Sequence, residues 1–206
     1  MVVAALMAGR FSIVGLVTMA FVGVAAADTA SSSVSANAFT QQLGAQVGAV
    51  TGGTTTPGGV GVAGHYSYRL SSKDWIVVGA DFVFGRQQSA CGMAVDSGLD
   101  CDHGLASGFA AGLDVGVRRY LASQGSFVPY VQGGFAVHVA RFRADELTGL
   151  AIPVVVGGGI RASASDVVGI FAGAQLRVGP SWYNRGLGSR AYASMLVAAG
   201  VEFAVD

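Results

Sequence analysis

The stretch that decides the fold is residues 108–121, GFAAGLDVGVRRYL. Every second residue in it is apolar, in the order Phe109, Ala111, Leu113, Val115 and Val117. The residues between them are small or charged, in the order Ala110, Gly112, Asp114, Gly116 and Arg118. A period of two is typical of a β-strand, because successive side chains point to opposite faces of the pleat. An apolar face opposite a small and charged face indicates a strand between lipid and a polar lumen.

Seven other segments repeat this alternation, which makes eight expected strands. Their apolar positions fall within residues 43–49, 60–70, 76–84, 131–139, 154–160, 168–176 and 193–203. Short turns are expected at 71–74, 122–126 and 163–166, and longer loops at 51–59, 87–107, 144–150 and 180–189. An even strand number with alternating long and short connections is typical of outer-membrane barrels. We therefore predict an all-β fold, an eight-stranded antiparallel up-and-down transmembrane β-barrel, with periplasmic turns and extracellular loops.

The composition favours a surface that faces lipid. Charged residues make up 12% of the chain and hydrophobic residues 52%, whereas a soluble domain carries about a quarter charged residues. The best candidate for a membrane helix, residues 147–160, contains Pro153 and is well short of the ~20 apolar residues that a helix needs to cross a bilayer. The formal net charge is zero. The chain therefore lacks the excess of basic residues that would indicate nucleic acid as a partner.

The first 27 residues have the features of a secretory signal peptide. Arg10 supplies the positive charge, residues 11–24 form the apolar run, and three alanines at 25–27 form a small-residue cleavage site. A single membrane anchor is the alternative. Residues 28–39 are rich in Ser, Ala and Thr and are expected to form a short periplasmic leader. The barrel domain then spans 40–206, and the expected location is the cell outer membrane after export through the periplasm.

The interior of such a barrel should be filled. A spanning sheet must close, since each unsatisfied backbone group costs several kcal/mol in hydrocarbon, and eight strands leave an interior just wide enough for side chains. The charged residues of the inward phases are Arg69, Asp81, Asp114, Arg118, Arg161, Arg177 and Glu202. Buried charges must be paired, so we expect an interior ion-pair network that plugs the lumen, with no cofactor.

The longest loop contains the two cysteines of the chain, Cys91 and Cys101. The periplasm is oxidising, so we predict a disulfide that closes this loop and contributes about 2–3 kcal/mol. The same loop holds a polar cluster of Asp96, Asp100, Asp102 and His103. Its spacing does not match the EF-hand pattern. We therefore expect a solvated acidic loop and no metal.

Several arginines fall at the expected extracellular ends of strands or in the loops. They are Arg86, Arg141, Arg143, Arg185 and Arg190. A guanidinium group matches the geometry of phosphate, so this rim, Arg86, Arg141 and Arg143 above all, is a candidate site for lipopolysaccharide phosphates. Solvated loop charge is the alternative, and both interpretations stay open at this point.

Two motifs carry a resemblance to a known family. Residues 129–134, PYVQGG, are similar to the Pro-Tyr-Val-x-Gly-x-Gly strand of the small eight-stranded outer-membrane proteins of the OmpA and OmpX kind. Gly200, Phe203 and Val205 resemble the signal that outer-membrane insertion machinery reads on a last strand, with Val205 in place of the usual aromatic residue. The resemblance covers about residues 40–205. It implies outer-membrane lipid and lipopolysaccharide as surroundings, the insertion machinery as a partner, and a monomer.

One histidine lies in a motif known from enzymes. The pair His65 and Ser67 is similar to the His-x-Ser pair of outer-membrane lipid A deacylases, but it faces inward without an acidic partner nearby in sequence. We expect His65 and His138 to be interior histidines with hydrogen-bond partners.

Aromatic residues near the strand ends are expected to form interface girdles. These residues are Tyr68, Trp75, Phe127 and Phe203 at one end and Phe84, Phe109 and Tyr192 at the other.

Three functions fit this sequence. The first is a non-enzymatic outer-membrane barrel that serves envelope integrity or surface interaction through its extracellular loops. The second is a lipid A-modifying enzyme, which would need His65 or His138 and a carboxylate near a lipid-accessible groove. The third is a soluble lipocalin-like barrel that binds an apolar ligand, which would need the apolar phase inside.

Overall fold

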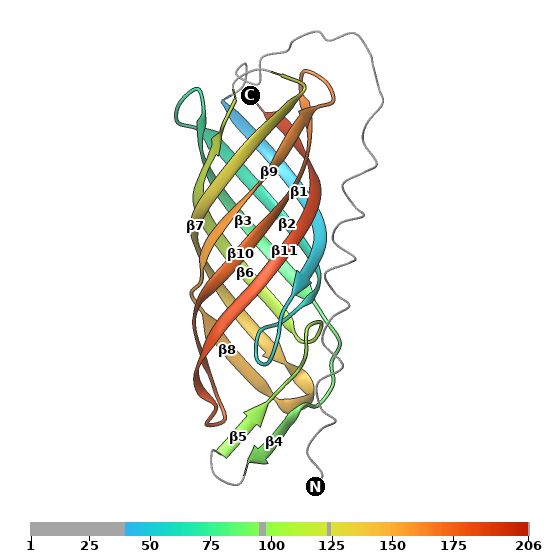
Figure 1. The fold of residues 1–206 in the computed structure, drawn as a ribbon, viewed down its shortest axis with the longest axis vertical. Coiled ribbons are helices and arrows are strands. Elements are labelled where there is room, and N and C mark those ends of the chain that lie inside the picture. Colours follow the sequence, from blue (N-terminus) through green and yellow to red (C-terminus); the bar gives the residue numbers. More distant parts are fainter. Residues whose placement is uncertain (1–39, 95–97, 123–124, 206) are drawn as a thin grey trace, which may run out of the picture. The chain divides into compact units, whose positions relative to one another are not determined.

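The computed structural model describes residues 40–94, 98–122 and 125–205, where nearly all of the chain is β-structure. The predicted signal peptide (1–27) and leader (28–39) lie outside the described residues. The barrel strands form one antiparallel sheet that closes on itself, and a two-stranded hairpin forms a second, separate sheet (Figure 1). No helix within these ranges has the length and apolar character needed to span a membrane.

The strands follow one another along the chain. They are β1 (Gln41–Thr51), β2 (Gly59–Arg69), β3 (Asp74–Phe84), β4 (Cys91–Ala94), β5 (Gly98–Cys101), β6 (Phe109–Tyr120), β7 (Phe127–Phe142), β8 (Leu147–Ala151), β9 (Val154–Ser163), β10 (Val168–Tyr183) and β11 (Gly188–Val205). β8 and β9 both pair with β7 on one side and β10 on the other. They therefore act as one wall strand, interrupted where Pro153 lacks a backbone N–H. With the β4–β5 hairpin set aside, the wall has eight strands.

The barrel closes between its first and last strands. β1 pairs antiparallel with β11 from Gln41 opposite Val205 to Thr51 opposite Met195. Each other wall strand pairs with its neighbours in chain order, so the sheet has no free edge along its wall. Closure satisfies the backbone groups that an open edge would expose to hydrocarbon. The predicted fold, an eight-stranded antiparallel up-and-down transmembrane barrel, is confirmed.

The two faces of the wall differ as the alternation predicts. On the outside Leu113 is 67% exposed and Phe135 is 62% exposed, whereas on the inside Arg177 is only 2% exposed. The outward phase carries apolar side chains on every wall strand, and the inward phase carries most of the charged ones. This arrangement is the reverse of what a soluble lipocalin-like barrel needs, because that barrel keeps its apolar phase inside, whereas this one carries it on the outer surface.

Two of the expected long loops are short. The loop predicted at 144–150 is reduced to a 3₁₀ turn, η1 (Arg143–Asp145), because β7 continues to Phe142 and β8 begins at Leu147. The loop predicted at 180–189 shrinks to 184–187, because β10 and β11 extend toward each other. Both stretches contain charged residues and glycine, and the second begins with Pro180, which favours loops. Both predictions were wrong because cross-strand pairing continues into these stretches.

We call the two ends of the barrel the loop end and the turn end. The loop end carries the connections 52–58, 85–108, 143–146 and 184–187, and the β4–β5 hairpin lies there (Figure 1). The turn end carries the connections 70–73, 121–126 and 164–167. The extended β7–β8 and β10–β11 hairpins make the wall taller on one side of the loop end.

Two of the predicted girdle aromatics lie inside the barrel. Trp75 and Tyr192 are almost completely buried, because both belong to the inward phase of their strands. The Trp75 ring meets Tyr120 edge to face with 6.3 Å between centroids, and the Tyr192 hydroxyl lies 3.1 Å from Nδ1 of His138. The remaining girdle residues point outward. They are Tyr68, Phe127 and Phe203 at the turn end and Phe84 and the half-buried Phe109 at the loop end.

Candidate functional site: the filled lumen and the closed loop end

A buried carboxylate organises the lumen near the turn end. Glu202 on β11 is fully buried, and its Oε2 accepts a hydrogen bond of 3.0 Å from Nε of Arg161 on β9. Nη1 of Arg118 on β6 donates to its Oε1, and Nε2 of His65 on β2 lies 3.0 Å from that same oxygen. One side chain therefore ties four separate wall strands together across the interior.

Aromatic side chains close the space around this ion cluster. The guanidinium carbon of Arg118 lies 4.6 Å from the centre of the Tyr130 ring and 5.6 Å from that of Phe171. Trp75 and Tyr120 belong to the same buried cluster. Arg118 thus combines an ion pair with cation–π contacts, and the turn end of the lumen is filled by side chains.

A second ion cluster lies nearer the loop end. Nη1 of Arg177 on β10 donates to Oδ2 of Asp81 on β3 over 2.9 Å. Nε2 of His138 lies 3.4 Å from Oδ1 of Asp81, and its Nδ1 faces the Tyr192 hydroxyl. Strand pairing between β10 and β11 gives the separation of the two clusters. Glu202 of the first cluster pairs with Gly169, and Arg177 of the second pairs with Ser194, eight residue pairs further along. Five of the seven residues predicted for the interior network therefore lie in two clusters, one around Glu202 and one around Asp81.

Asp114 and Arg69 are the other two residues of the predicted network. Asp114 is half-buried beside Gly79 and belongs to none of the ion pairs in the described part of the chain. A cavity of about 30 Å³ adjoins Asp114 together with Gln132 and Gln175, which is room for a water molecule or two. Arg69, the last residue of β2, is half-buried.

His65, the histidine of the His-x-Ser motif, has a carboxylate partner, Glu202, that lies far away in the sequence. Glu202 contacts His65 although 137 positions separate them. Ser67 is almost fully buried, and its Oγ has no hydrogen-bond partner among the described residues. His65 and Ser67 therefore share a face of β2 without forming a hydrogen-bonded pair, and both are enclosed in the lumen.

At the loop end, the disulfide between Cys91 and Cys101 joins β4 to β5, with an S–S distance of 2.05 Å. Cys101 is buried in a small apolar core with Phe142, Leu147 and Tyr183. These three come from the extended hairpins of the wall. The disulfide-linked hairpin therefore packs against the wall and closes the loop end.

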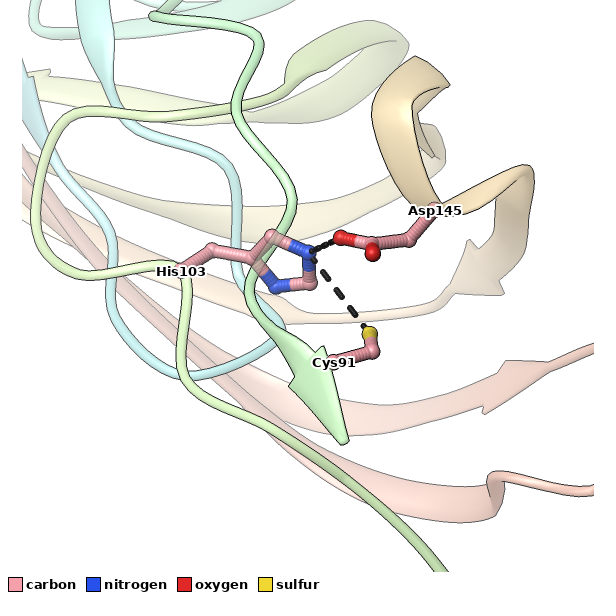
Figure 2. Close-up of side chains that lie close together, drawn as sticks. All are labelled: Cys91, His103 and Asp145. Carbon is pink, nitrogen blue, oxygen red and sulfur yellow. Dashed lines mark hydrogen bonds and ion pairs between the residues drawn. The ribbon is translucent and has the colours of Figure 1, made fainter. Parts of the chain in front are cut away.

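Next to the disulfide lies a buried histidine–carboxylate pair (Figure 2). His103 is 2% exposed, and its Nε2 lies 2.8 Å from Oδ2 of Asp145. Its Nδ1 lies 2.8 Å from the carbonyl oxygen of Thr54, and its ring stacks on Phe142. A carbonyl oxygen only accepts, so Nδ1 donates to Thr54, and Nε2 is the ring nitrogen that faces the carboxylate. This ring links the connections 52–58 and 85–108 to η1.

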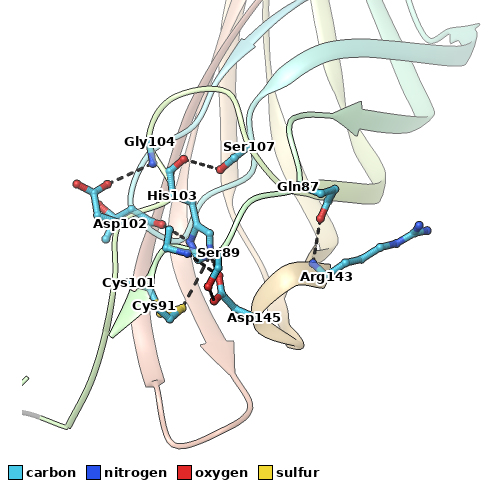
Figure 3. Close-up of polar contacts among 12 residues, drawn as sticks. Gln87, Ser89, Cys91, Cys101, Asp102, His103, Gly104, Ser107, Arg143 and Asp145 are labelled. Atoms are coloured by element: carbon cyan, nitrogen blue, oxygen red, sulfur yellow. Dashed lines mark hydrogen bonds and ion pairs between the residues drawn. A yellow bond between two sulfur atoms is a disulfide. The ribbon is translucent and has the colours of Figure 1, made fainter. Parts of the chain in front are cut away.

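Asp145 accepts two further hydrogen bonds (Figure 3). Oγ of Ser89 donates to Oδ1 over 2.6 Å, and the backbone N–H of Ala90 donates to Oδ2 over 3.0 Å. Burial alone would raise the pKa of Asp145, but the hydrogen bonds from Ser89, Ala90 and His103 outweigh it and hold this pKa below its ordinary value of 3.8. The sequence did not single out Asp145, because no local spacing relates it to His103.

We expect this arrangement to survive mild acid. Because folding lowers the pKa of Asp145 from 3.8, its ionised form stabilises the folded state above pH 3.8, and that contribution disappears only as the pH falls through the lowered pKa. Hydrogen exchange of the Ala90 amide, followed from pH 7 downward, should stay slow at pH 5. An Asp145→Asn variant should exchange faster at every pH. Fast exchange in the unaltered protein at pH 5 would contradict this account.

Reduction of the disulfide should loosen the loop end and spare the wall. The disulfide closes a short loop and contributes about 3 kcal/mol to local stability, whereas the wall is held by its own strand pairing. Proteolysis within 85–108 should become faster after reduction, while the unheated protein keeps its compact gel mobility. A Cys91→Ser, Cys101→Ser double variant should not respond to the reductant. Loss of the compact form on reduction would show that the wall depends on the bond.

The acidic cluster predicted in this loop is not assembled as a site. Asp100 and Asp102 are exposed, and Oδ1 of Asp102 accepts a hydrogen bond from the Gly104 amide. His103 turns inward, away from these two, and Asp96 lies outside the described residues. The histidine therefore pairs with a carboxylate from another connection.

The arginines proposed for lipopolysaccharide occupy different surfaces of the loop end. Arg141 lies in the outward phase of β7, opposite Phe109 on β6. Arg143 lies on η1, where its backbone N–H donates to Oε1 of Gln87 and its side chain points away from the disulfide (Figure 3). Arg86, just after β3, is exposed.

The proposed assembly motif lies on the last strand. Phe203 and Val205 point outward and are exposed, whereas Gly200 belongs to the inward phase. A Cβ atom at Gly200 would overlap the backbone carbonyl oxygen of Ala45 on β1 and would lie 2.7 Å from the ring of Phe171. Gly200 is therefore required by the close backbone of β1 and by the aromatic side chain beside it.

Of the comparisons with known proteins, the one with solved structures finds proteins of similar fold. No family model matches the chain, and no curated protein matches its sequence. Neisserial surface protein A, NspA, is similar in structure with a TM-score of 0.58 and 12% identity, over 80% of this chain and 97% of that chain. Ail, the attachment invasion locus protein of Yersinia pestis, has a TM-score of 0.45 and 11% identity, over 80% of this chain and 99% of that chain. The outer membrane protease OmpT of Escherichia coli has a TM-score of 0.45 and 9% identity, over 86% of this chain and 99% of that chain. The fold is that of the small outer-membrane β-barrels.

Proposed function

We propose that this chain is an outer-membrane protein that acts without catalysis and presents a rigid surface at its loop end for contacts at the cell surface. The observation that supports this most is the joining of three connections, 52–58, 85–108 and 143–146. The disulfide closes the connection 85–108 on itself, and His103 links this connection to 143–146 through Asp145 and to 52–58 through the carbonyl oxygen of Thr54. Because preordered loops lose less conformational entropy on binding, such a surface suits recognition.

Backbone hydrogen bonds add to this rigidity. The amide of Gly52 donates to the carbonyl of Leu105 over 2.8 Å, and that of Gly58 donates to Ser107 over 2.9 Å. The hydroxyl of Tyr183 donates to the carbonyl of Thr55. The first connection is therefore bound both to the longest connection and to β10.

The enclosed positions of the titratable groups favour a non-enzymatic role over lipid modification. His65, His138 and their carboxylate partners are all buried inside the wall, whereas an acyl-chain substrate would approach from the outer, lipid-facing side. Comparing lipid A from cells with and without the gene tests the alternative. An altered acylation pattern that depends on His65 or His138 would favour the enzyme and overturn this part of the proposal.

The orientation of the barrel can be tested with its single lysine. Lys73 lies in the connection 70–73 at the turn end, which the proposal places in the periplasm. A membrane-impermeant amine reagent applied to intact cells should leave Lys73 unlabelled. It should label a Met93→Lys variant at residue 93, because Met93 is 82% exposed on the β4–β5 hairpin. Peptide masses locate the label, and lysed cells provide the positive control for Lys73. Labelling of Lys73 in intact cells would reverse the orientation.

Lipopolysaccharide is the second proposed contact, and the position of Arg141 favours it. Arg141 faces outward beside Phe109, whose ring lies 5.6 Å from that of Phe84. A guanidinium group just beyond outward aromatic residues is placed at headgroup level, where it can bind phosphate.

An Arg141→Glu variant should therefore retain less lipopolysaccharide through purification. Arg119→Glu is the matched control, because Arg119 also faces outward on the wall but at the turn end. Equal retention by the unaltered protein and Arg141→Glu would remove lipopolysaccharide phosphate from the proposal.

A further inference from the structure

We infer that the loop end holds a metal site when its disulfide is open: the thiolates of Cys91 and Cys101, Nε2 of His103 and the carboxylate of Asp145 bind one thiophilic divalent cation such as Zn²⁺. Two thiolates, an imidazole and a carboxylate are a donor set that zinc accepts. The four side chains come from β4, β5, the connection that follows β5, and η1.

The donor atoms are already gathered. One ligand atom each from Cys91, His103 and Asp145 lies within 4.8 Å of the others. Sγ of Cys91 is 3.9 Å from Nε2 of His103, which is 2.8 Å from Oδ2 of Asp145 (Figure 2). Bond lengths of about 2.0–2.3 Å in a tetrahedral zinc site place neighbouring donors about 3.3–3.8 Å apart. The Cys91 sulfur and the imidazole therefore stand close to the required spacing before any rearrangement.

The histidine and the carboxylate are also held in a suitable orientation. Nδ1 of His103 donates to the carbonyl oxygen of Thr54 over 2.8 Å, so Nε2 is the nitrogen turned toward the cluster. Metal-binding histidines commonly donate their other ring nitrogen to a carbonyl in this way. Oδ1 of Asp145 accepts from Ser89, and its Oδ2 faces His103 (Figure 3).

Only the reduced protein can bind the cation. The sulfurs of a disulfide carry no charge, and the thiolate is the form that binds metals. A dithiol gives two electrons and two protons to the Cys91–Cys101 bond, which breaks into two thiols while the dithiol becomes a disulfide. Binding of the cation then releases the two thiol protons and the proton that Nε2 of His103 shares with Asp145. The cation replaces that proton, and the site carries two thiolates, one carboxylate and a neutral imidazole.

The loop end therefore has two closed states, one held by the disulfide and one held by the metal. Reduction by itself loosens the connection 85–108, and the cation restores its contact with η1. Both states use the sulfurs of Cys91 and Cys101, which are either bonded to each other or free to bind the cation, so the two states exclude each other.

The test uses the full chain folded in detergent micelles, with Co²⁺ as a spectroscopic probe that Zn²⁺ can displace. After reduction and removal of the reductant, one Co²⁺ per chain should bind and give the absorption of a tetrahedral thiolate site. The oxidised protein should give none of this absorption. Zn²⁺ added to the reduced protein should restore the resistance of 85–108 to protease. An absent signal in the reduced protein, or an equal one in the oxidised protein, overturns the inference.

Variants separate the four-ligand site from binding by the two cysteines alone. Asp145→Asn and His103→Gln should each weaken Co²⁺ binding by about 10-fold or more in the reduced protein. Asp102→Asn is the matched control, because Asp102 lies next to His103 but is exposed, and its affinity should be unchanged. If Asp145→Asn and His103→Gln bind as tightly as the unaltered chain, the cation is held by thiolates alone and the proposed site is wrong.

Discussion

Replacing Glu202 by glutamine should lower the free energy of unfolding by about 3–5 kcal/mol, the usual cost of removing one partner from a buried ion pair. Glu202 is fully buried and compensates both Arg118 and Arg161. A neutral amide of the same shape leaves two guanidinium groups in the lumen without an anion. Urea unfolding in phospholipid vesicles measures the loss.

The matched control for this change is Glu146→Gln. Glu146 also pairs with an arginine, since its Oε2 lies 3.6 Å from Nη1 of Arg185, but its side chain is 83% exposed. Exposed pairs of this kind contribute about 0–1 kcal/mol, so this variant should unfold nearly as the unaltered protein does. Similar losses for the two variants would mean that the Glu202 cluster does not support the barrel.

Replacing Val115 by arginine should cost about 2–4 kcal/mol, as expected for a charge on the lipid face of a barrel near the bilayer midplane. Val115 lies in the middle of β6, points outward and is more than half exposed. Its surroundings are the apolar outward side chains Val78 and Phe135 on the paired strands. The same unfolding measurement in vesicles applies.

Met93→Arg is the control for the change at Val115. Met93 is even more exposed than Val115 but lies on the β4–β5 hairpin, which is not part of the wall. In water this substitution should change stability by no more than about 0.5 kcal/mol. A Val115→Arg variant as stable in vesicles as Met93→Arg would show that the outward face of β6 does not contact lipid.

The fold was predictable because its signal is local. The alternation along 108–121 predicts which side chains share a face of the strand. Leu113 is exposed and its neighbour Asp114 is half-buried, so the predicted outward and inward faces are correct. Eight such segments with turns between them define an antiparallel barrel. The loops predicted at 144–150 and 180–189 were wrong, because strand pairing there overrides the loop preference of proline, glycine and charged residues.

The partners of the buried charges were not predictable from the sequence. Glu202 meets residues that are 41, 84 and 137 positions away, and His103 meets Asp145 across 42 positions. These distances along the chain carry no pattern, because the contacts depend on strand register and on the closure of β1 against β11.

By itself the sequence determined the alternation, the number of wall strands, and which charged residues face the lumen, since each depends on neighbours along the chain. The tertiary structure decided that these charges divide between Glu202 and Asp81, and that His103 reaches Asp145 beside the disulfide. Closing the sheet brings distant strands face to face across the lumen, and only that closure selects which charges can pair.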